Sequence, residues 1–254
     1  MSKAFLYFVS GKTHLIRLLV SVYSLRAIYK DGPILFFYPK DEDPYYLQLI
    51  SRDLNIRAEL VSFSPFKTKK NYGYVNKTVI PKLSHYEENI FLDADTLIVS
   101  DIDELWPIDD EFVITQFSNW KTSNIKKRLE KWFDIFPEIE QDSSFWKLPA
   151  INSGIYSYKR DSLLLDKWAF YVKKNPRFIA DELVLQILCR DYYCRVLDDS
   201  FNFSPIYGKS LKPKIYHFHG NKHKDNPLWQ SYYKQCFDND IGNLRTILNL
   251  QLPI

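Results

Sequence analysis

The sequence predicts an α/β protein built on a mostly parallel sheet with helices on both faces. Short apolar runs of strand length alternate with longer segments whose apolar residues recur at helical spacing. This order is typical of βαβ units, in which successive strands run parallel and helices cover the sheet. The length of 254 residues, with 46% apolar and 26% charged residues, is ordinary for a globular domain.

The first hundred residues contain these elements in alternation. The expected strands are residues 4–9, 32–39, 58–63 and 89–93, and the expected helices are residues 13–29, 43–53 and 77–86. The second strand, for example, is an apolar run bounded by Gly32 and Pro39. Thr13 is the expected N-cap of the first helix. Pro81 should break the third helix, because proline lacks the backbone N–H.

Charge and cysteine content narrow the classes of protein to which this chain can belong. The net charge of +3 is too small to indicate a nucleic-acid partner, and the basic stretch 67–77 is expected to be a solvated loop. Cys189, Cys194 and Cys236 are odd in number and lack CxxC spacing, which argues against a disulfide framework or a zinc knuckle. The sequence shows no signal-peptide pattern and no apolar stretch of membrane-span length, so we expect a soluble cytoplasmic protein.

Two aspartates directly after the fourth strand are the first candidates for a functional site. Asp93 and Asp95 are separated by one residue and lie between the apolar runs "IFL" and "TLIV". A buried carboxylate is costly unless it has a partner. In open parallel sheets, ligands bind just beyond the carboxyl ends of the strands. Two carboxylates at such an edge can ligate one hard cation together, so the sequence predicts a metal site here.

One family with this pattern is the haloacid-dehalogenase phosphatases, whose apolar strand is followed by Asp-x-Asp-x and then Thr or Val. In this chain the fifth place is Leu97, and the threonine, Thr96, stands one place early. That motif also normally lies near the start of its domain, whereas here several elements precede it. In this interpretation Asp93 would be a covalent nucleophile and the protein a phosphohydrolase.

A second pattern is carried by five segments in a fixed order along the chain. They are "RLLVSVYSLR" (17–26), "KTVIPKLSHYEENIFLDADTLIVSDIDELW" (77–106), "AINSGIYSYKRDSLLLDKW" (150–168), "ADELVLQ" (180–186) and "IYHFHGNKHK" (215–224). Together they resemble the nucleotide-sugar glycosyltransferases of family 8, the group that includes glycogenin and bacterial galactosyltransferases. The resemblance covers most of residues 4–224. It implies a GT-A fold, which is a Rossmann-like domain with an extended metal-binding loop.

The resemblance implies a metal-dependent glycosyltransferase. The donor would be a nucleotide-diphospho-sugar, with a UDP-sugar as the first expectation, and the acceptor a hydroxyl of a glycan, glycoprotein or glycolipid. Asp93 and Asp95 would hold a cation that neutralises the charge developing on the leaving pyrophosphate. His217 would be the third metal ligand, with His219 as a rival. Imidazole together with carboxylates favours Mn²⁺, with Mg²⁺ as the alternative.

The resemblance also assigns the donor-binding residues. These are Val9, Ser10, Lys82, Asp93, Ala94, Asp95, Asn152, Ser153, Gly154, Gly220 and Lys222. Val9 and Ser10 would contact the base or ribose, and Lys82 the diphosphate or sugar. Asn152 and Ser153 would hydrogen-bond sugar hydroxyls, beside a glycine that allows close backbone approach.

Asp181 and Glu182 are the implied catalytic pair, near the reacting sugar and the acceptor. Glu182 stands where the family usually has Gln. The family retains the anomeric configuration, and retention is expected here, whereas an inverting enzyme would need one of these carboxylates as a general base. The late motif departs from the family as well. His223, between Lys222 and Lys224, occupies the place of the family's lysine six residues after the metal histidine.

Residues 117–146 look like an insertion that is rich in tryptophan and charge. Trp120, Trp132 and Trp146 are expected to lie in the core, which is the usual place of tryptophan, and stacking on a sugar ring is the alternative.

We expect a single GT-A catalytic domain over residues 1–254. Residues 1–100 would form the nucleotide-binding part, 101–224 the donor- and acceptor-site part, and 225–254 a helical tail. A non-catalytic module that binds a nucleotide-sugar is the third functional hypothesis.

Overall fold

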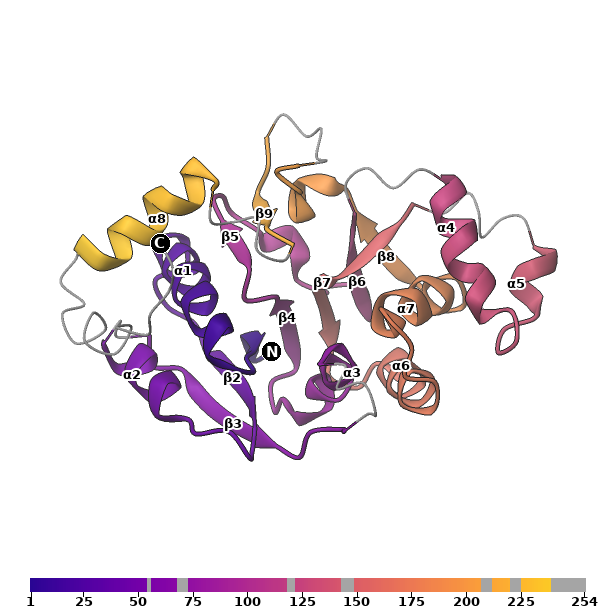
Figure 1. The fold of residues 1–254 in the computed structure, drawn as a ribbon, viewed down its shortest axis with the longest axis horizontal. Coiled ribbons are helices and arrows are strands. Elements are labelled where there is room, and N and C mark those ends of the chain that lie inside the picture. Colours follow the sequence, from indigo (N-terminus) through magenta and orange to yellow (C-terminus); the bar gives the residue numbers. More distant parts are fainter. Residues whose placement is uncertain are drawn as a thin grey trace.

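The computed structural model describes residues 1–53, 56–67, 73–117, 122–142, 149–206, 212–219 and 225–238. Its centre is a seven-stranded sheet of order β3-β2-β1-β4-β7-β6-β8 (Figure 1). The strands of this sheet are β1 (Lys3–Phe8), β2 (Ile34–Pro39), β3 (Glu59–Phe63), β4 (Glu88–Leu92), β6 (Phe112–Gln116), β7 (Ile151–Lys159) and β8 (Cys194–Leu197). β1 pairs in parallel with β2 and β4, and β2 with β3. The predicted α/β architecture with a mostly parallel sheet is therefore confirmed.

Helices cover both faces of the sheet. They are α1 (Lys12–Ile28), α2 (Tyr45–Asp53), α3 (Tyr74–Lys77), α4 (Thr122–Leu129), α5 (Glu138–Gln141), α6 (Leu163–Lys174), α7 (Ala180–Asp191) and α8 (Pro227–Asp238). The apolar residues of α1 and α2 belong to one buried cluster, and those of α4, α6 and α7 belong to another. All five residues of β4 are buried, as expected for a central strand that is covered on both faces.

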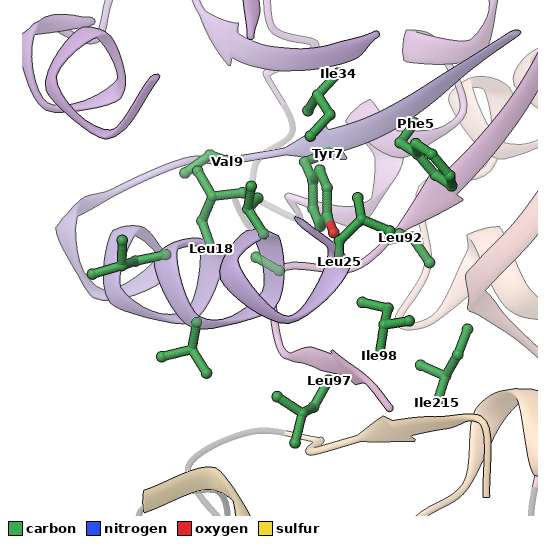
Figure 2. Packing of buried hydrophobic residues seen from close by; sticks show 14 of the residues in the cluster. Phe5, Tyr7, Val9, Leu18, Leu25, Ile34, Leu92, Leu97, Ile98 and Ile215 are labelled. Carbon is green, nitrogen blue, oxygen red and sulfur yellow. The ribbon is translucent and has the colours of Figure 1, made fainter. Parts of the chain in front are cut away.

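Figure 2 shows how α1 packs on the sheet. Leu18 and Leu25 of this helix lie close to Tyr7 of β1 and to Val9, the residue directly after β1. All four side chains are buried. The packing of α1 on this face thus holds the carboxyl end of β1 in a fixed position.

Two details of the expected helices were wrong. Helix α1 begins at Lys12 with Gly11 at the N-cap position, so Thr13 lies inside the helix and is not its cap. The helix expected over residues 77–86 does not form as one element. Instead, α3 ends at Lys77, and a 3-10 turn follows over Ile80–Leu83. Pro81 is the physical reason, because it lacks a donor N–H and disfavours a helical conformation in the residue before it.

Strand β7 runs against its neighbours and ties the two halves of the chain together. It is antiparallel to β4 and to β6. Leu92 at the end of β4 pairs with Ile155, so the beginning of β7 lies at the edge where β4 ends. A separate two-stranded sheet at that edge joins β5 (Thr96–Ile98) to β9 (Ile215–His217) in antiparallel register.

The insertion contributes to the core. Trp132 is 1% exposed, and the Arg177 guanidinium lies 5.1 Å from its ring centroid. The core expectation is thus confirmed for Trp132, whereas Trp120 and Trp146 lie outside the described residues. Of the basic stretch 67–77, residues 68–72 also lie outside them.

The C-terminal segment is helical over α8, which packs against α1 through the buried Trp229 and Cys236. Residues 239–254 of the expected tail lie outside the described part. Cys189, Cys194 and Cys236 are free thiols in the structure. Within the described ranges, no helix combines the length and the apolar character that crossing a membrane would require.

Replacing Trp132 by Ala should destabilise the protein by about 3–5 kcal/mol, because it removes a fully buried aromatic side chain and leaves a cavity. The unfolding free energy from urea titration measures this loss. Phe170→Ala is the matched control, since Phe170 is 54% exposed, and it should cost much less. Equal costs for the two variants would contradict the placement of Trp132 in the core.

Candidate active site

Asp93 and Asp95 lie in the tight turn between β4 and β5, and backbone hydrogen bonds fix both. The Asp93 N–H donates to the Gly154 carbonyl at 2.8 Å, which anchors the turn to β7. The Phe218 N–H donates to the Asp95 carbonyl at 2.9 Å, which anchors it to the segment after β9. The Thr96 hydroxyl donates to the Asp93 carbonyl at 2.7 Å. Both carboxylates are thus held at the edge of the sheet by neighbours from distant parts of the chain.

His217 reaches the two aspartates through the pairing of β5 with β9, in which Thr96 lies opposite His217. Its Nε2 is 3.2 Å from Asp95 Oδ1 and 3.6 Å from Asp93 Oδ2. Among the described residues, these three side chains form a group whose ligand atoms lie within 4.8 Å of one another. Two carboxylates and one imidazole are a donor set suited to a divalent metal ion.

A second layer of hydrogen bonds fixes the orientation of the His217 ring. Asn202 donates its side-chain N–H groups to Thr115 Oγ1 at 2.8 Å and to Asn152 Oδ1 at 3.2 Å. Its Oδ1, 2.9 Å from His217 Nδ1, is left as an acceptor. Asn202 therefore orients the His217 ring through Nδ1, so that Nε2 faces the two aspartates, which is the side of the ring that a metal ion would use. His219 is not in the group; its ring packs at a tilt against His217 and edge-to-face against Phe117.

Lys77, at the end of α3, supplies positive charge beside the aspartates. Its Nζ donates to Asp93 Oδ2 at 2.6 Å, and both side chains are mostly buried. Burial by itself would lower the pKa of Lys77, but Asp93, Asp181 and Asp95 together raise it above its ordinary value. Burial also favours the neutral form of Asp95, yet His217, His219 and Lys77 bring the pKa of Asp95 below its ordinary value.

Asp181 and Glu182 lie in the first turn of α7 and face the beginning of β7. The Ser153 hydroxyl donates to Asp181 Oδ2 at 2.7 Å, and Asn152 Nδ2 donates to Glu182 Oε2 at 2.9 Å. Ile179, just before the helix, has a left-handed conformation with φ 53°, which is unusual for a β-branched residue and typical of functional sites. The structure thus brings the segment at 150–168, with Asn152 and Ser153, into contact with the segment at 180–186, with Asp181 and Glu182.

Burial is the largest influence on the pKa of both Asp181 and Glu182. It raises the pKa of Asp181, and Lys77 and the Ser153 hydroxyl offset only part of the shift. Burial also raises the pKa of Glu182. The guanidinium of Arg128 in α4, 2.8 Å from the carboxylate, opposes this shift.

Gly154 shows how closely the parts of the site approach. A Cβ atom there would lie 2.8 Å from Asp93 Oδ2 and would overlap the His217 ring. The beginning of β7 can therefore pass behind the candidate metal ligands only with glycine at this position.

Lys82, one of the donor-binding candidates, lies apart from Asp93 and Asp95. Its Nζ pairs with Asp166 of α6 at 2.8 Å. The neighbouring Pro81 carbonyl accepts from Tyr158, which pairs with Asn89 near the start of β4, so this turn lies toward the other edge of the sheet. Lys77 occupies the place expected for Lys82.

The remaining donor-binding candidates lie in different parts of the structure. Val9 has its side chain in the core and can offer only backbone atoms. Ser10 lies at the carboxyl edge, where its hydroxyl donates to Glu42 at 2.5 Å. Ala94 is buried between the two aspartates. Gly220 and Lys222 lie outside the described residues.

The arrangement of strands is shared with solved glycosyltransferase structures. Galactosyltransferase LgtC, in a complex with donor and acceptor sugar analogues, has a TM-score of 0.62 to this chain, over 92% of this chain and 96% of LgtC at 11% identity. The chain has the GT-A fold. GlyE of Streptococcus pneumoniae TIGR4 has a TM-score of 0.63, over 96% of this chain and 64% of GlyE at 14% identity. The bifunctional glycosyltransferase WbbM has a TM-score of 0.56, over 92% of this chain and 51% of WbbM at 12% identity.

The GT-A likeness concerns the fold, since the identities are low. No protein-family model matches the chain, and neither does any curated protein sequence. The expected GT-A fold is confirmed, while the roles of individual residues depend on the geometry above.

Gly154→Ala should weaken the binding of Mn²⁺ by about 10-fold or more, because the methyl group displaces Asp93 and His217 from their positions. Gly73→Ala is the matched control, since a Cβ at Gly73 meets nothing within 4 Å, and it should bind Mn²⁺ normally. Electron paramagnetic resonance of free Mn²⁺ gives both affinities. Unchanged affinity in Gly154→Ala would contradict this position of the metal ligands.

Asp181→Asn should gain stability relative to the wild type as the pH rises from 4 to 8. The pKa of Asp181 is raised in the folded protein, so the folded state favours the protonated form. Its contribution to stability is present at low pH and is lost as the pH rises through the folded pKa, whereas Asn stays neutral throughout. Urea unfolding with EDTA across this pH range tests the sign. A difference that shrinks with pH would contradict it.

Proposed function

We propose that this protein is a metal-dependent glycosyltransferase that uses a nucleotide-diphospho-sugar, with UDP-sugars as the first donors to test and Mn²⁺ as the first metal. One observation carries the proposal. Asp93 and Asp95 come from one end of β4, and His217 comes from far along the chain, yet their ligand atoms converge within 4.8 Å. When bound there, a divalent cation neutralises charge on the diphosphate and on the leaving group.

The surrounding residues suit the remaining tasks. Lys77 would place a second positive charge against the diphosphate, as a point charge on a mostly buried side chain. Asn152 and Ser153 would orient the donor sugar from the beginning of β7. In this proposal the β1–β4 part of the sheet binds the nucleotide, and the later part holds the donor sugar and the acceptor. LgtC was solved in a complex with donor and acceptor sugar analogues, which supports the idea that a fold of this kind can bind both substrates.

Retention of the anomeric configuration is part of the proposal. An inverting enzyme needs a carboxylate that can take the proton of the acceptor hydroxyl. Both oxygens of Glu182 are engaged, Oε1 by Arg128 and Oε2 by Asn152. Glu182 is therefore a poor candidate for that base, and Asp181 is the carboxylate to examine if inversion is found.

The two alternative functions, a phosphohydrolase and a non-catalytic binding module, are not equally supported. The phosphohydrolase hypothesis needs a haloacid-dehalogenase domain, and the GT-A fold removes that basis. A non-catalytic module that binds a nucleotide-sugar would use the same site, and only turnover separates it from an enzyme. Such a module would bind UDP with Mn²⁺ and release no nucleotide from any donor.

A panel of nucleotide-sugars with glycan acceptors, read by release of free nucleotide, should identify a donor that is turned over with Mn²⁺ and not with EDTA. Asp93→Asn and Asp95→Asn should each lower that turnover by about 100-fold or more, because each removes a charged metal ligand. Both variants should stay folded, since the aspartates lie in a turn at the sheet edge and not in the core.

Asp101→Asn is the control for this experiment. Asp101 is an exposed carboxylate six residues further along the same acidic stretch, and its replacement should leave turnover unchanged. Near wild-type turnover in either Asp93→Asn or Asp95→Asn would show the metal assignment to be wrong.

A further inference from the structure

The carboxylate of Glu182 is held between two partners that come from different parts of the chain. Arg128 Nη2 lies 2.8 Å from Oε1, and Asn152 Nδ2 donates to Oε2 at 2.9 Å. The side chains of Glu182 and Arg128 are 11% and 18% exposed. Glu182 is thus a largely buried anion whose positive partner comes from the inserted segment.

This ion pair is one of several that connect the insertion to α7 and to the segment before it. Arg190 of α7 pairs with Asp142 at 2.8 Å, and Arg177 pairs with Asp134 at 2.6 Å. Those two pairs are between a third and two thirds exposed, so they contribute little to stability. Figure 1 shows α4 beside α7, and the Arg128 pair is the contact between them that reaches the candidate active site.

The Arg128–Glu182 pair is continuous with the candidate metal ligand. Glu182 accepts from Asn152, and Asn152 Oδ1 in turn accepts from Asn202 Nδ2 at 3.2 Å. Asn202 Oδ1 then accepts from His217 Nδ1 at 2.9 Å. An unbroken series of hydrogen bonds therefore runs from the insertion to His217.

Fixed donors set the direction of each bond in this series. The Gly154 N–H donates to Asn152 Oδ1 at 2.9 Å, so the Asn152 amide turns its N–H toward Glu182. Thr115 gives its hydroxyl proton to the Ile155 carbonyl and accepts from Asn202, which leaves the Asn202 Oδ1 for His217. Glu182 therefore receives a donor on each oxygen, from Asn152 and from Arg128, which is the environment of an ionised carboxylate. Burial raises the pKa of Glu182, and Arg128 opposes that shift.

We propose that Arg128 is a positioning residue, which supplies the countercharge of the buried Glu182 and so holds that carboxylate and Asn152, the first member of the series that supports His217, in place. The proposal rests on the glycosyltransferase function proposed above. It also explains how this chain accommodates Glu at a place where Gln is usual in the similar family. A neutral Gln would need no countercharge, whereas a buried Glu without one is strongly destabilising.

The test compares five proteins: wild type, Arg128→Met, Glu182→Gln, the double variant Arg128→Met/Glu182→Gln, and Arg190→Met. Arg190→Met is the matched control, since it removes an ion pair between the same two regions without touching Glu182. Donor KM, kcat and the urea midpoint of unfolding are measured for each protein.

Arg128→Met should lower kcat/KM by about 10-fold or more, the usual effect of losing a residue that orients metal ligands. The double variant should recover to within a few-fold of Glu182→Gln alone, because Gln no longer needs the arginine. Arg190→Met should keep wild-type kinetics. The unfolding midpoint of Arg128→Met should likewise be restored by adding Glu182→Gln.

A merely structural role for Arg128 would give a different pattern. Arg128→Met would then lower the unfolding midpoint and keep wild-type kcat and KM, because the stranded Glu182 destabilises the fold whatever it does at the site. That result would overturn the proposal. If the wild type turns over no donor, the proposed function fails, and the affinity for UDP with Mn²⁺ decides the inference instead: weaker binding in Arg128→Met that is restored by adding Glu182→Gln supports it, and unchanged binding in Arg128→Met overturns it.

Discussion

The antiparallel pairing of β5 with β9 is the contact on which the candidate active site depends. It joins Thr96, directly after the aspartates, to His217, which is more than a hundred residues further along the chain. The Phe218 N–H continues the contact by donating to the Asp95 carbonyl. Without this small sheet the two carboxylates of the turn would have no imidazole beside them. The seven-stranded sheet then serves to hold the turn at a fixed place next to the beginning of β7.

The second constraint is electrostatic. Four carboxylates, those of Asp93, Asp95, Asp181 and Glu182, are gathered at one mostly buried edge, where isolated anions are costly. Each has a distinct partner: Lys77 for Asp93, His217 for Asp95, Ser153 for Asp181, and Arg128 with Asn152 for Glu182. The site is therefore anionic where a metal ion would bind, and cationic where Lys77 would meet a diphosphate.

The sequence predicts the fold well because its signals are local. The apolar runs of β1, β2 and β4 are short and nearly continuous, and their alternation with segments of helical spacing indicates parallel pairing. The turn after β4 was equally visible, since two carboxylates next to a buried strand have few structural explanations. Pro81 predicts the break in the helix, but not the direction that the chain takes around it. The chain turns away after Lys77, so Lys77 and not Lys82 reaches the aspartates.

The contacts that the sequence did not reveal are those between distant segments. Nothing local distinguishes Arg128 from the other basic residues of α4, or Asn202 from any asparagine in a polar turn. Their importance arises only when the insertion packs on α7 and the 3-10 turn at Asp199–Asn202 packs on β7 and β9. The choice between His217 and His219 was open for the same reason. It depends on which ring faces Asp95, and that is set by the end of β9.

The central claim is that Asp93, Asp95 and His217 bind one divalent cation together with a nucleotide diphosphate. The most direct measurement is a crystal structure with Mn²⁺ and UDP, in which anomalous scattering at the manganese edge locates the metal. The account predicts one anomalous peak about 2.0–2.6 Å from an oxygen of each aspartate and from His217 Nε2, bridged to the diphosphate. A peak held by other residues, or UDP bound at this edge with no metal beside the three side chains, would contradict it.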